Sequence, residues 1–168
     1  MTTIVARPQL KRIVPAADAP GDRLNAFIRR AWHSDFVVAH DEQIRPAELA
    51  GFVALDGDVV AGHAGYRLAE DGCELVAIAV EPRRSGIGSA LMDAVVEAAR
   101  TAEARRVWLT TTNDNLDALR FYQRRGFRLI VLRPGVVEEA RRRLKPDLPP
   151  TGEYDIPMRD ELDLELRL

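Results

Sequence analysis

The first half of the chain combines one amphipathic segment with three apolar runs that are separated by polar turns. Apolar residues recur at helical spacing over residues 22–32, which predicts a helix. The Asp56-Gly57-Asp58 turn lies between two apolar runs and is typical of a β-hairpin, and a second polar turn follows at residues 70–72. Strands joined by such short turns lie antiparallel and adjacent. These strands are expected over residues 51–55, 59–68 and 74–80.

The second half of the chain alternates helical and strand patterns. Helices are expected over residues 87–103, 115–125 and 136–144, and strands over residues 107–111, 127–132 and 160–168. Asn113 or Asp114 is the expected N-cap of the second of these helices. In the last strand leucines alternate with charged residues, which is typical of a half-exposed strand. Such a strand would offer an unpaired edge, through which a homodimer could form.

Strands that are followed by a strand-helix-strand crossover indicate an α+β fold. We expect a mixed, mostly antiparallel central sheet of about six or seven strands, flanked by helices. The length of 168 residues is that of one domain. A single domain over residues 1–168 is therefore the expected organisation.

Composition excludes several classes of protein. The chain has 24 Lys and Arg against 26 Asp and Glu, a net charge of -2, which argues against a nucleic-acid-binding protein. One cysteine, Cys73, and three histidines without ligand spacing predict neither a disulfide framework nor a metal site. No apolar run reaches membrane-spanning length, so no membrane partner is expected. The N-terminus lacks signal-peptide features, which makes the cytoplasm the expected location.

The turn between the strand 74–80 and the helix that begins at Ile87 carries the most chemical information. Gly86 and Gly88 allow the backbone to approach a ligand closely. Free N–H groups at the start of a helix suit a pyrophosphate, and Arg83 and Arg84 add positive charge. The glycines alone are explained equally well by an ordinary tight turn.

Two common nucleotide-binding motifs do not fit this turn. A dinucleotide-binding fold requires a third glycine where this chain has Leu91. A phosphate-binding loop of the Gly-Lys-Ser/Thr type requires a lysine, and none is near.

Residues 83–88 (R-R-S-G-I-G) resemble the Q/R-x-x-G-x-G/A signature of the GCN5-related N-acetyltransferases, where it binds the pyrophosphate of acetyl-CoA. Residues 115–127 are similar to the second cofactor segment of that family, N-x-x-A-x-x-x-Y-x-x-x-G-F. The two segments occur in the right order, and the resemblance covers roughly residues 51–132. Many members have about two more residues before the first glycine, so it is open whether Arg83 or Arg84 faces the phosphates.

The resemblance implies a sheet that is splayed at the cofactor site and an acyl-CoA N-acyltransferase activity. An acetyl group would pass from acetyl-CoA to a primary amine by direct attack in a ternary complex. The acceptor would be a small-molecule or protein amine. The residues expected to bind the cofactor are Ile78, Ala79, Val80, Arg83, Arg84, Ser85, Gly86, Ile87, Gly88, Ser89, Ala90, Asn115 and Tyr122.

The resemblance also implies catalytic roles for two side chains. Tyr122 occupies the position of the acid that protonates the leaving thiolate, and its alternative role is that of a core tyrosine. Glu74 stands where some members carry the base that takes the proton of the amine. Burial beside apolar neighbours would raise the pKa of Glu74, whereas its alternative is a solvent-facing glutamate after a turn. The backbone N–H of Ala79 or Val80 would stabilise the charge that develops on the thioester oxygen.

Two non-enzymatic alternatives stay open. A sensor or regulatory module that binds acyl-CoA would need Gly86, Gly88 and Asn115 but neither Glu74 nor Tyr122, so the presence of Tyr122 favours the enzyme. A structural or interaction domain with a degenerate site would need none of these residues. Acceptor specificity is expected from Trp32, His33 and Phe36.

Overall fold

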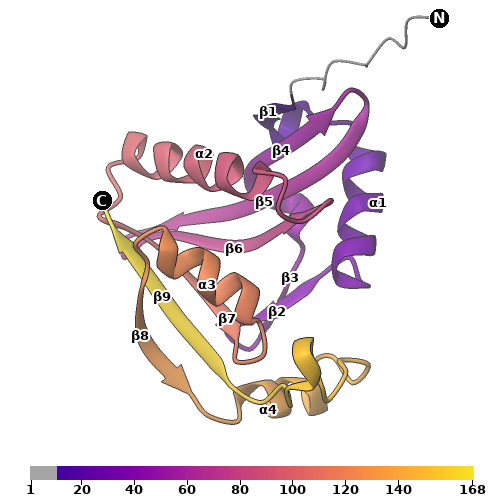
Figure 1. Ribbon diagram of the computed structural model, residues 1–168, viewed down its shortest axis with the longest axis vertical. Helices are drawn as coiled ribbons and strands as arrows, with labels where there is room; N and C mark the ends of the chain where they lie inside the picture. The colour runs from indigo at the N-terminus through magenta and orange to yellow at the C-terminus, as the bar shows by residue number, and fades with distance from the viewer. Residues whose placement is uncertain (1–10) are drawn as a thin grey trace, which may run out of the picture.

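The computed structural model describes residues 11–168 (Figure 1). Seven strands form one mixed sheet in the order β1-β4-β5-β6-β7-β9-β8, and β2 and β3 form a separate hairpin. The strands are β1 (Arg12–Pro15), β2 (Val37–Ala39), β3 (Glu42–Ile44), β4 (Ala50–Asp56), β5 (Val59–Ala69), β6 (Gly72–Val80), β7 (Arg106–Thr112), β8 (Arg128–Arg133) and β9 (Glu161–Arg167). The helices are α1 (Gly21–Trp32), α2 (Ile87–Thr101), α3 (Leu116–Arg124) and α4 (Val136–Arg143), with short 3-10 segments η1 (Ala16–Asp18), η2 (Pro46–Glu48) and η3 (Glu153–Asp155).

The predicted α+β class and the predicted sheet are confirmed. Every predicted helix and strand is present, with ends that differ by only a few residues. The sequence pattern missed β1, β2 and β3, because runs of three or four residues are too short for a period to stand out. The expected lack of a signal peptide rests largely on residues 1–10, which lie outside the described residues.

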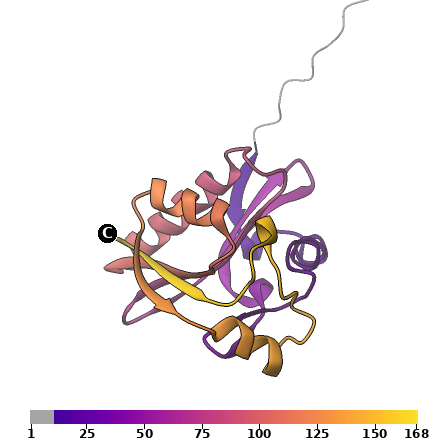
Figure 2. The same cartoon turned by 60° about the horizontal axis from the view of Figure 1, so that its bottom comes forward.

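Helices cover both faces of the sheet (Figure 2). On one face Leu91 and Val95 of α2 are fully buried in a core cluster to which α3 also contributes. On the other face Phe27 and Ile28 of α1 pack with Val53 of β4. Full burial of each such side chain stabilises the fold by about 1.5–3 kcal/mol, so the two clusters hold the sheet between its helices.

The sheet opens between its two central parallel strands. β6 and β7 are paired only at Cys73–Val107 and Glu74–Trp108, near the start of each strand. Beyond these pairs the strands diverge, and the register of β6 against β5 shifts between residues 75 and 77, which is the mark of a β-bulge. The C-terminal halves of β6 and β7 are therefore separated by a gap, as the predicted splay requires.

The C-terminal strand is not at an edge of the sheet, so the prediction of an unpaired edge on β9 is wrong. β9 pairs with β7 on one side and with β8 on the other. The local pattern did not reveal that β8 folds back to pair along β9. At this end of the sheet the edge strand is β8, where Leu132 is 58% exposed. A homodimer stays a prediction, but β9 has no free edge through which it could form.

The charged residues of β9 are also more buried than the alternating pattern predicted. Glu161 and Asp163 are buried, and Arg133 of β8 forms a bidentate ion pair with Asp163. Thr110 of β7 donates a further hydrogen bond to Asp163 over 2.7 Å. A carboxylate can be buried where such partners satisfy it, so the polar face of β9 is covered at Glu161 and Asp163, whereas Arg167 at its end is exposed.

Candidate active site

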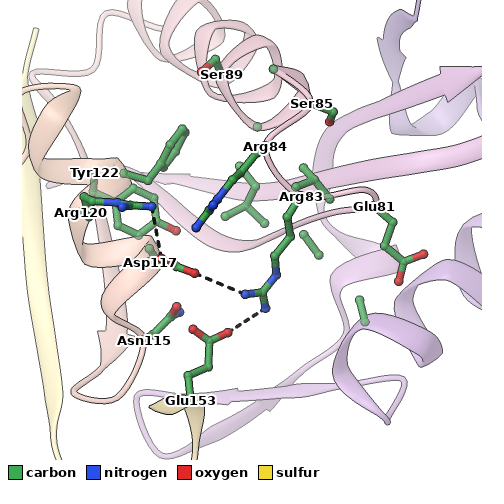
Figure 3. A pocket seen from close by; sticks show the side chains of 18 of the residues that line it. Glu81, Arg83, Arg84, Ser85, Ser89, Asn115, Asp117, Arg120, Tyr122 and Glu153 are labelled. Carbon is green, nitrogen blue, oxygen red and sulfur yellow. Dashed lines mark hydrogen bonds and ion pairs between the residues drawn. The ribbon is translucent and has the colours of Figure 1, made fainter.

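A cleft of about 1100 Å³ lies at the gap between β6 and β7. The end of β6, the turn after it and the start of α2 form one wall, and α3 forms the other (Figure 3). Most of the predicted cofactor residues line this cleft. They are Ile78, Ala79, Val80, Arg83, Arg84, Ser85, Gly86, Gly88, Ser89, Asn115 and Tyr122.

Ile87, Ala90 and Glu74 are not among the residues that line the cleft. The side chain of Ile87 is buried in the core against the sheet. The N–H of Ala90 donates to the carbonyl of Gly86 over 3.1 Å, which is the first hydrogen bond of α2. Only the amides that precede Ala90 are therefore left for a ligand.

The turn before α2 has the shape of an anion site. Gly86 is the N-cap of α2, with φ of 82°, a left-handed conformation that costs other residues about 1–2 kcal/mol. No side chain caps this helix end. At Gly88 a Cβ atom would lie 3.8 Å from the ring of Phe121, so it would fit there in ordinary van der Waals contact. The free N–H groups and the helix dipole thus face a cleft wide enough for a phosphate group.

The two arginines of the turn differ in their partners. Arg83 donates a hydrogen bond to Glu153 over 2.7 Å and lies 3.8 Å from the carboxylate of Asp117. Arg84 also projects into the cleft (Figure 3), and within residues 11–168 it forms no ion pair. Arg84 is therefore the guanidinium of this turn that is available to an anion.

Further arginines line the cleft from α3 and from its C-terminal end, namely Arg120, Arg124 and Arg125. Arg124 lies in the last turn of α3 and Arg125 is its C-cap, where positive charge also interacts favourably with the helix dipole. No local signal distinguishes an arginine at a helix end from one that faces a ligand.

Tyr122 places its hydroxyl toward the cleft, whereas its ring is packed in the core (Figure 3). The ring contacts Phe121 and Phe127, with centroid distances of 5.5 and 5.7 Å. Burial raises the pKa of the phenol well above its ordinary value. The two roles predicted for this residue are thus compatible, because a core ring carries a hydroxyl that stays protonated at neutral pH.

Asn115 is the N-cap residue of α3, but its side chain does not cap the helix. Its amide group donates instead to Thr111 Oγ1 over 3.1 Å. The prediction that Asn113 or Asp114 is the N-cap of this helix is therefore wrong. Asn113 accepts hydrogen bonds from two backbone N–H groups just before β9, and Asp114 accepts one from Glu153. Long-range contacts thus take both side chains away from the helix end.

The backbone ladder shows which amides of β6 face the gap. The N–H of Glu81 donates to the carbonyl of Ala61 on β5. In an antiparallel ladder alternate residues point the same way, so the N–H of Ala79 also points to β5. The N–H groups of Ile78 and Val80 point to the gap. Of the two predicted backbone donors, Val80 is the one with the required direction.

Glu74 lies near the start of β6, at the closed end of the gap. Its carboxylate accepts hydrogen bonds from His40 Nε2 over 2.6 Å and from Arg67 Nε over 2.5 Å, and only 4% of the residue is exposed. Burial by itself would raise the pKa of this carboxyl, but the bonds from His40 and Arg67 outweigh it and lower the pKa. The expected rise in pKa is therefore wrong, and so is the alternative of a solvent-facing glutamate.

These ion pairs predict a pH-dependent contribution to stability. Because the pKa of Glu74 is lowered, its ion pairs stabilise the fold fully above the pKa of a glutamate in the unfolded chain, which is about 4.3. This stabilisation is lost as the pH falls through the lower pKa of Glu74 in the folded state. The hydrogen bond to Glu74 raises the pKa of His40. Protonated His40 therefore contributes fully to the stability of the fold below about pH 6.5, and this contribution is lost as the pH rises through the raised pKa of His40.

We therefore expect Glu74→Gln to lower the free energy of unfolding most between about pH 5 and 6.5, by about 1–2 kcal/mol. The expected loss of stability is modest because His40 and Arg67 are partly exposed to solvent, which screens their charges. At about pH 9 only the pair with Arg67 remains and the loss is smaller. Urea unfolding of both proteins at these pH values tests this, with the exposed Glu138→Gln as control. A difference that does not change with pH would contradict it.

The end of α1 forms another part of the cleft. Trp32 lines it, together with Arg30 and Ala31, whereas His33 and Phe36 do not. The ring of Trp32 lies edge-on to His63, with centroids 6.5 Å apart. His63 is fully buried, and burial lowers its pKa to about 4. Of the three predicted specificity residues, the structure thus brings only Trp32 to the cleft.

Sequence reasoning missed Glu153, which reaches the cleft from the loop after α4. The loop was assigned no role, because a glutamate among prolines has no periodic or motif signal. Residues 11–168 contain no group of three or more His, Cys, Asp and Glu that could hold a metal ion. Nor is any of the helices described here long and apolar enough to cross a membrane.

The sequence model of the acetyltransferase (GNAT) family matches residues 19–127, which include the whole turn before α2 and all of α3. The chain belongs to the GNAT family of acetyltransferases. It is therefore an acyl-CoA N-acyltransferase by family. Two relatives extend the similarity over 89% of this chain and 94% of each relative. They are the uncharacterized Bacillus subtilis proteins YxbD, 38% identical over 151 residues, and YdhI, 35% identical over 152 residues.

Solved structures of GNAT acetyltransferases share this fold. A Bacillus subtilis acetyltransferase in complex with CoA superposes with a TM-score of 0.72 at 22% identity, covering 95% of this chain and 99% of that one. A GNAT acetyltransferase from Elizabethkingia anophelis with acetyl-CoA bound gives 0.70 at 19% identity, covering 94% and 98%. The ribosomal-protein-S18-alanine N-acetyltransferase from Escherichia coli gives 0.67 at 16% identity, covering 94% of each chain.

Proposed function

We propose that this protein transfers an acetyl group from acetyl-CoA to a primary amine, by direct attack of the amine in a ternary complex. The observation that carries the proposal is that an uncapped helix end, several arginines and a protonated tyrosine hydroxyl share one cleft, at a gap in the sheet. The CoA and acetyl-CoA in two structures of similar fold support it. We also propose that residues 1–168 act as a single domain.

The residues of the cleft have distinct roles in this proposal. Amides at the start of α2 and the Arg84 guanidinium bind the pyrophosphate. Asn115 lies where it can contact the arm that links the pyrophosphate to the thioester. The N–H of Val80 stabilises negative charge on the thioester oxygen. The hydroxyl of Tyr122 gives its proton to the departing thiolate, while the proton that the amine loses on forming the amide passes to solvent, from which the tyrosine is protonated again.

A base role for Glu74 stays a prediction that gains no support from the geometry. Its carboxylate is bonded to both His40 and Arg67, and its lowered pKa makes it a weaker base. We propose instead that Glu74 holds the β2–β3 hairpin, which carries His40, against the sheet.

Turnover is tested by incubating the protein with acetyl-CoA and one amine at a time while free thiol is measured. The amines are diaminobutane, alanine amide, Nα-acetyl-lysine amide and chloroaniline, which is unprotonated at neutral pH. We expect free thiol to be released only when an amine is present. Acetylated amine should form in the same amount as the thiol. Stabilisation by acetyl-CoA without turnover of any amine would favour the sensor.

Ligand binding is tested separately by thermal unfolding. A ligand at 100 times its dissociation constant stabilises the fold by about 2.7 kcal/mol, so acetyl-CoA should raise the melting temperature by several degrees. An unchanged melting temperature at high acetyl-CoA concentration would favour a domain with a degenerate site.

A further inference from the structure

The two halves of the sheet are joined by very few backbone pairs. β6 belongs to the half that contains β1, β4 and β5, and β7 belongs to the half that contains β9 and β8. Within residues 11–168, β6 and β7 pair only at Cys73–Val107 and Glu74–Trp108, and the gap begins beyond the second pair. The position of β6 relative to β7 at the cleft therefore depends on what holds the two strands together at Glu74 and Trp108.

His40, at the tip of the β2–β3 hairpin, contacts both residues of this last pair (Figure 1). Its Nε2 donates to the carboxylate of Glu74 over 2.6 Å, and its ring lies against that of Trp108, with centroids 5.3 Å apart. Cys73 and Leu75 belong to the core beneath α2, so Glu74 points to the opposite face of the sheet. His40 thus links β6 to β7 from that opposite face, and it does not line the cleft.

Further contacts hold the hairpin between the two halves of the sheet. On one side Glu42 of β3 accepts a hydrogen bond from Arg67 of β5 over 2.6 Å. On the other side Asp41 accepts hydrogen bonds from Arg143 of α4 over 3.0 and 3.1 Å, and α4 lies in the connection between β8 and β9. The hairpin is therefore tied to both halves, and His40 stands where they meet.

The turn of this hairpin has a sequence that its backbone does not favour. His40 and Asp41 both have positive φ, 52° and 63°, which is typical of a type I′ turn. Asn-Gly is the preferred sequence for such a turn, because few other residues adopt positive φ readily. Both side chains make contacts with distant residues instead. These long-range contacts, rather than the local preference, explain the residues at the turn.

The width of the gap matters because the proposed reaction uses groups from both walls of the cleft. Val80 is on β6, whereas Tyr122 is on α3, which follows β7. We propose that His40 is a positioning residue that holds β6 to β7 where the gap begins and so fixes Val80 relative to Tyr122. This inference rests on the proposed function. The start of α2 and Arg84 both lie on the β6 side, so binding of the pyrophosphate should depend far less on this link.

His40→Asn tests the inference, because asparagine favours a type I′ turn but is too short to reach Glu74. The turn should therefore form while the link is lost. A displacement of about 1 Å can lower a rate by about 100-fold, so kcat with the best amine of the panel should fall by about 10- to 100-fold. The KM for acetyl-CoA should change far less. A role in stability alone would lower the melting temperature but leave kcat unchanged wherever the variant is folded.

Two further variants make the result specific. His40→Gln keeps an N–H group for Glu74 without a positive charge and should recover part of the lost rate. Arg23→Gln removes a different long-range contact, between α1 and Asp58 in the turn after β4, and should leave kcat and every KM unchanged. A wild-type kcat in His40→Asn, or a KM for acetyl-CoA that rises as much as kcat falls, would overturn the inference.

The link should also depend on pH. The charged groups near His40 are Glu74 on β6, Arg67 on β5, and Glu161 and Asp163 on β9. The hydrogen bond to Glu74 raises the pKa of His40, so the link is fully charged below about pH 6.5 and loses its charge as the pH rises through the raised pKa. The ratio of the wild-type kcat to that of His40→Asn should therefore fall toward alkaline pH. A ratio that does not change with pH would overturn the charged link.

Hydrogen exchange separates this inference from the proposed function. In His40→Asn the backbone amides of residues 73–74 and 107–108 should exchange several-fold faster than in the wild type, whereas the amide of Val95 in the middle of α2 should exchange at the same rate. If no amine is acetylated, the transferase proposal fails, but this local change in exchange still supports the link made by His40. Equal exchange in both proteins, or an equal acceleration at Val95, overturns it.

Discussion

Replacing Tyr122 by Phe should lower kcat for acetyl transfer by about 100-fold or more, since a positioned acid contributes about 10²- to 10⁴-fold to a rate. The ring would keep its contacts with Phe121 and Phe127, so the fold should be retained. The hydroxyl forms no hydrogen bond to another residue between 11 and 168, and its loss leaves no such partner unpaired. The affinity for acetyl-CoA should therefore change far less than the rate.

The measurement is steady-state kinetics with the best amine of the panel, together with calorimetric titration of CoA. Tyr66→Phe is the matched control, because Tyr66 stacks on Phe52 away from the cleft, with centroids 6.0 Å apart. We expect the control to keep the wild-type rate. A wild-type kcat in Tyr122→Phe would remove this hydroxyl from the mechanism.

Gly88→Asp should separate the stability of the fold from the binding of the cofactor. The added Cβ has room, and an acidic side chain in the first turn of α2 is favourable to the helix dipole by about 0.3–1 kcal/mol. The protein without ligand should therefore be as stable as the wild type or slightly more stable. The same carboxylate competes with a pyrophosphate for the helix end.

A like charge at a binding site costs several kcal/mol, so the Kd of acetyl-CoA should rise by at least about 100-fold. Thermal unfolding with and without acetyl-CoA measures both effects in one experiment. Gly21→Asp, in the first turn of α1, adds the same charge at an open position outside the cleft and is the control. A ligand-induced rise in melting temperature that equals that of the wild type would refute the anion site at α2.

The regular elements could be predicted because their signals are local. The helical spacing of Leu91 and Val95 and the polar turns that flank β5 depend only on near neighbours in the chain. The turn at Gly86 was predicted for the same reason, because it lies between a strand and a helix whose patterns are both clear. Most of the residues at the start of α2 that line the cleft could therefore be predicted from the strand pattern before the turn and the helix pattern after it.

Two features could not be predicted, because each depends on residues far apart in the sequence. The edge position expected for β9 was wrong, since nothing local shows that β8 pairs along it. The pKa of Glu74 is lowered by His40, which is 34 residues away, and by Arg67 on the neighbouring strand. Burial of Glu74 alone would have had the opposite effect.

The chain by itself determined the α+β class, the order of its longer elements, and the glycine-containing turn before α2 followed at a set spacing by Tyr122. These depend on periodicity and backbone conformation, which neighbouring residues dictate. Only the tertiary structure decided which charged groups meet. Arg83 and Glu153 are 70 residues apart, yet they lie 2.7 Å from each other. Packing of distant segments brings such groups into contact, and no pattern along the chain encodes that distance.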